Sequence, residues 1–77
     1  MANLDTHERV TITVNGAASE LPRGTTLGRL LADLSVIADR VAVEVNLSVV
    51  DRGAFATTTI EEGDRVEIVN FVGGGHG

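Results

Sequence analysis

Apolar and polar residues alternate in several stretches of the chain, which is the period of two expected of a half-buried β-strand. The alternation is clearest where Val10, Ile12 and Val14 are separated by threonines. It returns over residues 41–45 and again near the end of the chain, over residues 66–71. Two shorter runs, residues 18–21 and 48–50, complete a set of five predicted strands.

The segment between the second and third predicted strands has the spacing of a helix. Thr25 or Thr26 can cap its N-terminus, because a threonine hydroxyl accepts from the free amides of the first turn. Val36 and Ile37 are expected to continue the burial beyond its C-terminus. Four leucines recur at i, i+3, i+4 and i+7 and predict one core-facing side: Leu27, Leu30, Leu31 and Leu34.

Turn residues separate these elements. Asn15 and Gly16 stand between two strand-like runs, and Asn-Gly is the strongest short hairpin signal because a type I′ turn needs positive φ at both positions. Asn46 predicts a second turn, and a tight turn near Phe55 is expected to carry that aromatic ring into the core. A polar turn over residues 61–64 precedes the last strand, and its acidic side chains favour a solvated turn over an acid cluster.

The order strand, strand, helix, strand, strand, strand predicts an α+β fold of the ubiquitin-like β-grasp type. In that architecture one main helix packs on one face of a mixed five-strand sheet, and the last strand returns beside the first. We expect a flexible N-terminal segment over residues 1–8, a β-grasp domain over 9–72 and a flexible glycine-rich tail over 73–77.

Composition and charge narrow the function classes for these 77 residues. The formal net charge of −5, with six arginines and no lysine, argues against binding to a phosphate backbone, so no nucleic acid partner is expected. With no cysteine and with histidine only at positions 7 and 76, no metal site is expected. Because no apolar stretch approaches 20 residues and no signal peptide opens the chain, we expect a cytoplasmic protein without membrane contact.

The last five residues hold four of the nine glycines and follow directly on the apolar final strand. A glycine tail is costly to order, but it can be threaded through a narrow channel into the active site of another protein. The alternative is a frayed terminus. If Val66 and Ile68 of the last strand face the core, Val69 and Phe71 form an exposed contact patch beside the tail, unless a loop covers that face.

Three segments, read in this order, resemble the ThiS family of sulfur carrier proteins from thiamine biosynthesis. They are residues 40–46 (RVAVEVN), 61–69 (EEGDRVEIV) and 70–75 (NFVGGG), and the similarity covers about residues 9–75. The predicted hairpin and helix also fall where that family has them. The FVGGG ending after an acidic turn and a strand is the most specific part of the match.

The resemblance implies a protein that is a co-substrate and not a catalyst, with no bound cofactor. In the family, a ThiF-like adenylating enzyme uses ATP to activate the carboxylate of the terminal glycine, and sulfur then replaces AMP to give a thiocarboxylate. A ThiG-like thiazole synthase takes that sulfur. By position, Gly75 would carry the thiocarboxylate, and Phe71, Val72, Gly73 and Gly74 would lie in the partner's channel.

Two departures from the family pattern matter. His76 and Gly77 extend past the usual terminal glycine, so either a peptidase removes them, or they are foreign to the natural chain, or activation occurs at Gly77; removal is favoured for a native sequence. Residues 46–51 (NLSVVD) lack the glycine that family members tend to have after the asparagine.

Other functions remain open: a MoaD-like carrier for molybdopterin synthesis, a ubiquitin-like protein modifier, or a binding module that uses only Val69 and Phe71.

Overall fold

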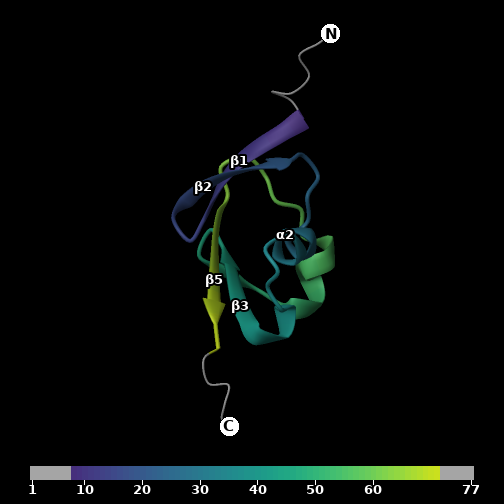
Figure 1. The fold of residues 1–77 in the computed structure, drawn as a ribbon, viewed down its shortest axis with the longest axis vertical. Coiled ribbons are helices and arrows are strands. Elements are labelled where there is room, and N and C mark those ends of the chain that lie inside the picture. The colour runs from purple at the N-terminus through teal and green to yellow at the C-terminus, as the bar shows by residue number, and fades with distance from the viewer. Residues whose placement is uncertain (1–7, 72–77) are drawn as a thin grey trace.

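The computed structural model describes residues 8–71, which form a mixed five-stranded sheet with one main helix on one face (Figure 1). The five predicted strands are all present, in the predicted β-grasp order. In chain order the elements are β1 (Arg9–Val14), β2 (Ala17–Pro22), α2 (Leu27–Asp33), the 3₁₀-helix η1 (Ala38–Arg40), β3 (Val41–Val45), β4 (Ser48–Val50), the 3₁₀-helix η2 (Arg52–Thr57) and β5 (Arg65–Asn70).

The last strand occupies the middle of the sheet, whose order is β2-β1-β5-β3-β4. β5 runs parallel to β1, with Thr13 beside Arg65 and Val14 beside Val66. On its other side it runs antiparallel to β3 along its whole length. The start of β1 and the end of β5 therefore lie at opposite ends of the molecule (Figure 1).

Both predicted asparagine turns are present. Asn15 and Gly16 have φ of 50° and 88°, as a type I′ hairpin between β1 and β2 requires. Asn46 and Leu47 have φ of 53° and 72° between β3 and β4. Leu47 thus holds the left-handed position that glycine takes most readily, so the turn forms without that glycine, at a conformational cost of about 1–2 kcal/mol.

The helix begins where the sequence predicts, but its C-terminal end differs. The hydroxyl of Thr26 accepts from the amide of Arg29 and caps α2. The helix stops at Asp33, and the side chain of Leu34, predicted to be on the core face, is 47% exposed. Ile37, also predicted to be buried, is 59% exposed.

A Schellman-type ending of α2 explains these two corrections. The amide of Ser35 donates to Ala32 O and the amide of Val36 donates to Leu31 O, with Ser35 in the left-handed conformation. This reversal of the chain directs Val36, not Leu34, against the core, where it packs partly buried. The 3.6-residue spacing therefore predicts one residue too many, because backbone hydrogen bonds of the C-terminal cap end the helix at Asp33.

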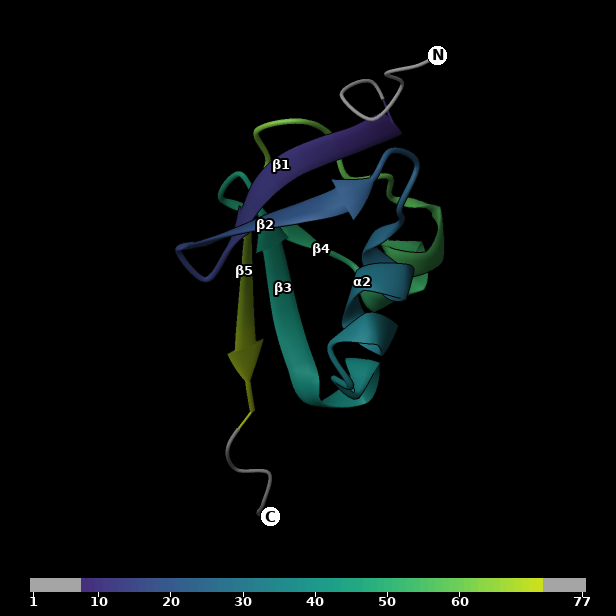
Figure 2. The same ribbon diagram turned by 45° about the horizontal axis from the view of Figure 1, so that its top comes forward.

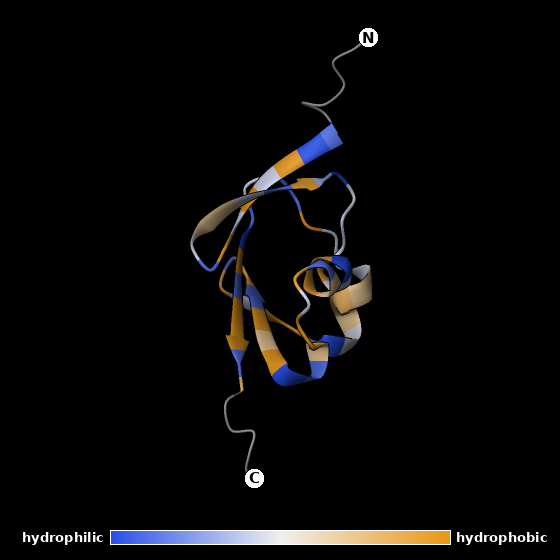
Figure 3. Ribbon diagram, in the orientation of Figure 1, coloured by the Kyte–Doolittle hydropathy of each residue, from blue (hydrophilic) through white to orange (hydrophobic). Residues whose placement is uncertain are grey.

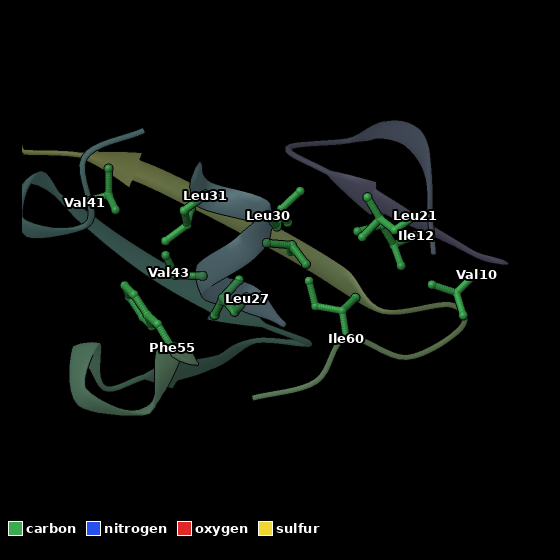
Figure 4. Packing of buried hydrophobic residues seen from close by; sticks show 11 residues of the cluster. Val10, Ile12, Leu21, Leu27, Leu30, Leu31, Val41, Val43, Phe55 and Ile60 are labelled. Carbon is green, nitrogen blue, oxygen red and sulfur yellow. The ribbon is translucent and has the colours of Figure 1, made fainter. Parts of the chain in front are cut away.

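The core lies between the sheet and α2 (Figures 2 and 4). Side chains from the strands and from the helix meet there, and Leu27 and Leu31 of α2 lie on the side of Val43 of β3. Within residues 8–71, eleven apolar residues are buried: Val10, Ile12, Leu21, Leu27, Leu30, Leu31, Val41, Val43, Phe55, Ile60 and Val66.

Phe55 reaches the core from a 3₁₀-helix, η2, where the sequence had predicted only a tight turn. η2 packs directly against α2, and Gly28 lies at the contact. A Cβ atom at position 28 would lie 3.4 Å from Phe55 O. Glycine in the first turn of α2 therefore permits a close backbone approach, at a cost in helix propensity of up to about 1 kcal/mol.

Candidate functional site

The two faces of β5 differ in burial, as the alternation predicts. Val66 is fully buried and Ile68 packs against the core, whereas Val69 is 58% exposed and Phe71 is 51% exposed. Figure 3 shows the hydrophobic colouring reaching the end of this strand. No loop covers Val69 and Phe71 within the described residues, so the apolar pair lies open at the point where the chain leaves the sheet.

The side chain of Asn15 extends the β1 side of the sheet along β5. Its backbone amide donates to Val66 O at 2.8 Å, and its Oδ1 accepts from the amide of Ile68 at 2.7 Å. Its Nδ2 donates to Ile68 O at 3.3 Å. Because a carboxamide carries the same donor and acceptor groups as a peptide, Asn15 replaces the next residue that β1 would have supplied.

Asn46 holds the start of β5 from the other side. Its amide donates to Arg65 O at 2.8 Å, and its Oδ1 accepts from the amide of Arg65 at 2.9 Å. Its Nδ2 donates to Asp64 Oδ1 at 2.9 Å. At the far end of the strand, the amide of Phe71 donates to Arg40 O at 2.9 Å. The strand is therefore hydrogen-bonded from Arg65 to Phe71, which gives the following tail a firm point of attachment.

The sequence predicts Asn15 and Asn46 only as turn residues with positive φ. It does not predict that their side chains form hydrogen bonds with the backbone of β5. The available signal was asparagine at both turns. Its carboxamide can both donate a hydrogen bond to a neighbouring strand and accept one from it, whereas an ionised aspartate can only accept.

The acidic residues before β5 hold the turn through backbone contacts. Glu62 Oε1 accepts from the amide of Thr11 at 2.9 Å, and Asp64 Oδ2 accepts from the amide of Glu61 at 2.8 Å. These contacts fit the turn interpretation of this run. Across residues 8–71, no group of three or more His, Cys, Asp or Glu side chains is placed to hold a metal ion. The same residues contain no helix long and apolar enough to cross a membrane.

The remaining predicted site residues, Val72, Gly73, Gly74 and Gly75, lie outside the described residues, as do His76 and Gly77. So does the N-terminal segment, apart from Glu8. The structure therefore describes the patch and the strand that carries the tail, and the assignments on the tail itself stay predictions.

Comparison with known proteins finds matches in sequence and in fold. Residues 7–75 match the model of the ThiS family. A crystal structure of the thiamine biosynthesis protein ThiS from Geobacter metallireducens is similar with a TM-score of 0.74 and 40% identity, covering 86% of this chain and 100% of that one.

Two relatives found by sequence similarity have very different lengths, one far longer than this chain and one close to it. A thiazole synthase of Magnetococcus marinus is 42% identical over 64 residues, which are 83% of this chain and 20% of that protein. The chain therefore spans 20% of the length of this thiazole synthase. The ycf40 protein of Porphyra purpurea is 32% identical over 69 residues, which are 90% of this chain and 97% of that protein.

Proposed function

The chain belongs to the ThiS family, and from this premise we propose that it is a sulfur carrier protein of thiamine biosynthesis and a co-substrate of other enzymes. The match to the family model ends at Gly75, the residue to which the proposal assigns the reactive carboxylate. This is the main support for the proposal, because the family match includes Gly75 and excludes His76 and Gly77.

The proposed chemistry takes place on the main chain. The carboxylate of Gly75 attacks the α-phosphorus of ATP in a partner enzyme and releases pyrophosphate. A sulfur nucleophile at the oxidation level of sulfide then displaces AMP and leaves a thiocarboxylate. The carrier supplies a terminus that can enter a closed site, and glycine suits this role because it lets the backbone approach catalytic groups closely.

The geometry of β5 supports this role. Amides of β5 and of Phe71 donate hydrogen bonds to Asn15 Oδ1, Asn46 Oδ1 and Arg40 O, so the position where the tail starts is defined relative to the body. The exposed side chains of Val69 and Phe71 lie next to that starting point. Docking of this apolar pair on the partner would direct the tail into its channel and exclude water around it.

Three partners follow from the proposal. A ThiF-like enzyme adenylates the carrier, a ThiG-like thiazole synthase receives the sulfur, and a peptidase removes His76 and Gly77 before activation. The similarity of this chain to part of the Magnetococcus marinus thiazole synthase supports association with the second partner.

The substitution Gly74→Val tests the proposal. A β-branched side chain next to the reactive glycine adds bulk inside the channel and disfavours positive φ, so adenylation should be lost. The buried core is formed by residues between Val10 and Val66, and we expect a change at position 74 to leave it intact, so the melting temperature should stay unchanged. The measurement is ATP–pyrophosphate exchange by the adenylating enzyme, with carriers that end at Gly75.

Gly53→Val is the matched control, because nothing lies within 4 Å of a Cβ added at Gly53 and its backbone φ is not positive. This variant should support exchange at the wild-type rate. If Gly74→Val also does so, the tail is not threaded through a narrow site, and the binding-module alternative gains support.

A further inference from the structure

Two carboxylates lie directly opposite each other on the sheet face that points away from α2. Glu44 of β3 pairs with Glu67 of β5 in the antiparallel register. Their neighbours Val43 and Val66 are buried against the helix, so the alternation places both glutamates on the outer face. Both residues are half-buried. Side chains of directly opposite residues have Cβ atoms about 4.5–5.5 Å apart.

No residue in the described part of the chain forms an ion pair with either glutamate. Among the described residues, the ion pairs are Arg9–Glu20, Arg29–Asp33 and Arg52–Asp39, none of which includes either glutamate. No hydrogen bond to either carboxylate is formed within the same part of the chain. Arg65 follows the same face two residues before Glu67, but it makes no ion pair with it. Like charges directly opposite on a sheet destabilise the fold.

Exposed apolar side chains surround the pair. Val49, opposite Glu44 on the adjoining strand β4, is 72% exposed. Val69, two residues beyond Glu67 on the same face, is 58% exposed, and Phe71 continues this row. We name these five residues the outer patch: Glu44, Val49, Glu67, Val69 and Phe71. The patch is continuous with the apolar pair beside the tail and extends it across three strands.

We propose that the outer patch docks on the adenylating partner and that a basic side chain of that partner lies between Glu44 and Glu67. This inference rests on the proposed function and adds a charge requirement to it. Docking removes the remaining water from these half-buried carboxylates. Because removing water from a charged group is unfavourable, the partner must supply a cation to offset that cost. A cation between two like charges that face each other on a sheet offsets their repulsion.

The test compares three proteins, each made as the full chain and as the form that ends at Gly75: wild type, Glu44→Gln/Glu67→Gln and a control, Glu8→Gln/Glu61→Gln. Glu8 and Glu61 are exposed, and their side chains make no hydrogen bond or ion pair within the described residues. Both double variants change the net charge equally, so general electrostatic attraction changes alike in both.

Binding to the purified adenylating enzyme is measured by calorimetry at low and at high salt, together with the melting temperature of each carrier. The Glu44→Gln/Glu67→Gln variant should bind roughly tenfold more weakly than the control at low salt and show a flatter salt dependence. Its melting temperature should rise by a few degrees, roughly, because repulsion has been removed.

Equal affinity of the two double variants at both salt concentrations would overturn the inference, and so would a fall in melting temperature for the Glu44→Gln/Glu67→Gln variant. ATP–pyrophosphate exchange separates this failure from a failure of the proposed function. If wild-type carrier supports exchange while the acidic pair proves dispensable, only the charge requirement is wrong. If wild-type carrier ending at Gly75 neither binds nor supports exchange, the proposed function and this inference both fail.

Discussion

Ser35 adopts a left-handed backbone conformation, with φ of 60°, where the chain reverses after α2. L-residues with a Cβ pay about 1–2 kcal/mol for this conformation, and glycine adopts it freely. The substitution Ser35→Gly should therefore stabilise the domain by roughly 0.5–1 kcal/mol, after the added flexibility of the unfolded chain is taken into account. Urea unfolding measured by circular dichroism gives this difference.

The matched control at the residue scale is Ser48→Gly. Ser48 is also exposed, but it lies in β4, where extended backbone gives glycine no conformational advantage. Glycine in a strand loses more entropy on folding, so this variant should be less stable by about 0.5–1 kcal/mol. Equal effects of the two substitutions would mean that backbone conformation at Ser35 stores no strain.

At the scale of the element, the two faces of β5 have different roles. The face with Val66 supports the fold, and the face with Val69 and Phe71 is proposed to bind the partner. Val66→Ala should lower the free energy of unfolding by about 1–4 kcal/mol, because it leaves a cavity at a fully buried position. Phe71→Ala and Val69→Asp should leave stability nearly unchanged, since both side chains are more than half exposed. Each should weaken binding to the adenylating enzyme by about 2 kcal/mol, roughly thirtyfold in affinity.

The two readouts for β5 are thermal unfolding and calorimetric titration with the adenylating enzyme. Ile68→Ala serves as a second core control, because Ile68 packs against the buried cluster. Unfolding of the domain by Phe71→Ala would show that this ring supports the fold and would remove it from the docking surface.

At the scale of the whole molecule, the strand that carries the tail is the central strand, and it ends at the opposite end of the domain from the start of β1 (Figure 1). A terminus at this position can enter a partner while the rest of the body stays outside. Because the match to the family model ends at Gly75, we predict that protein isolated from its native host during growth without thiamine ends at that residue. A fraction should be heavier by the exchange of one oxygen for one sulfur.

Intact-mass analysis measures both properties of that protein at once. Fragmentation places the sulfur, and a culture supplied with thiamine is the control, in which less of the heavier form should accumulate. Native protein found only with His76 and Gly77 attached would contradict the proposed processing, and sulfur located at Gly77 would move the reactive residue.

Local sequence determined most of the elements. Alternation defined β1, β3 and β5, Asn-Gly defined the first hairpin, and leucine spacing defined α2, because each signal depends on residues only a few positions apart. The same alternation correctly placed Val69 and Phe71 on the exposed side of β5 once Val66 faced the core. The motifs near the end of the chain identified the family, which the comparisons confirm.

Tertiary structure decided the features that depend on register and on competition between contacts. Leu34 is exposed because Val36 takes the covering position after the chain reverses, and Phe55 is carried by a 3₁₀-helix that packs on Gly28. The pairing of Asn15 with Ile68, and of Glu44 with Glu67, joins residues more than 20 positions apart. No local pattern specifies such a pairing, because a shift of one residue in strand register would change every partner.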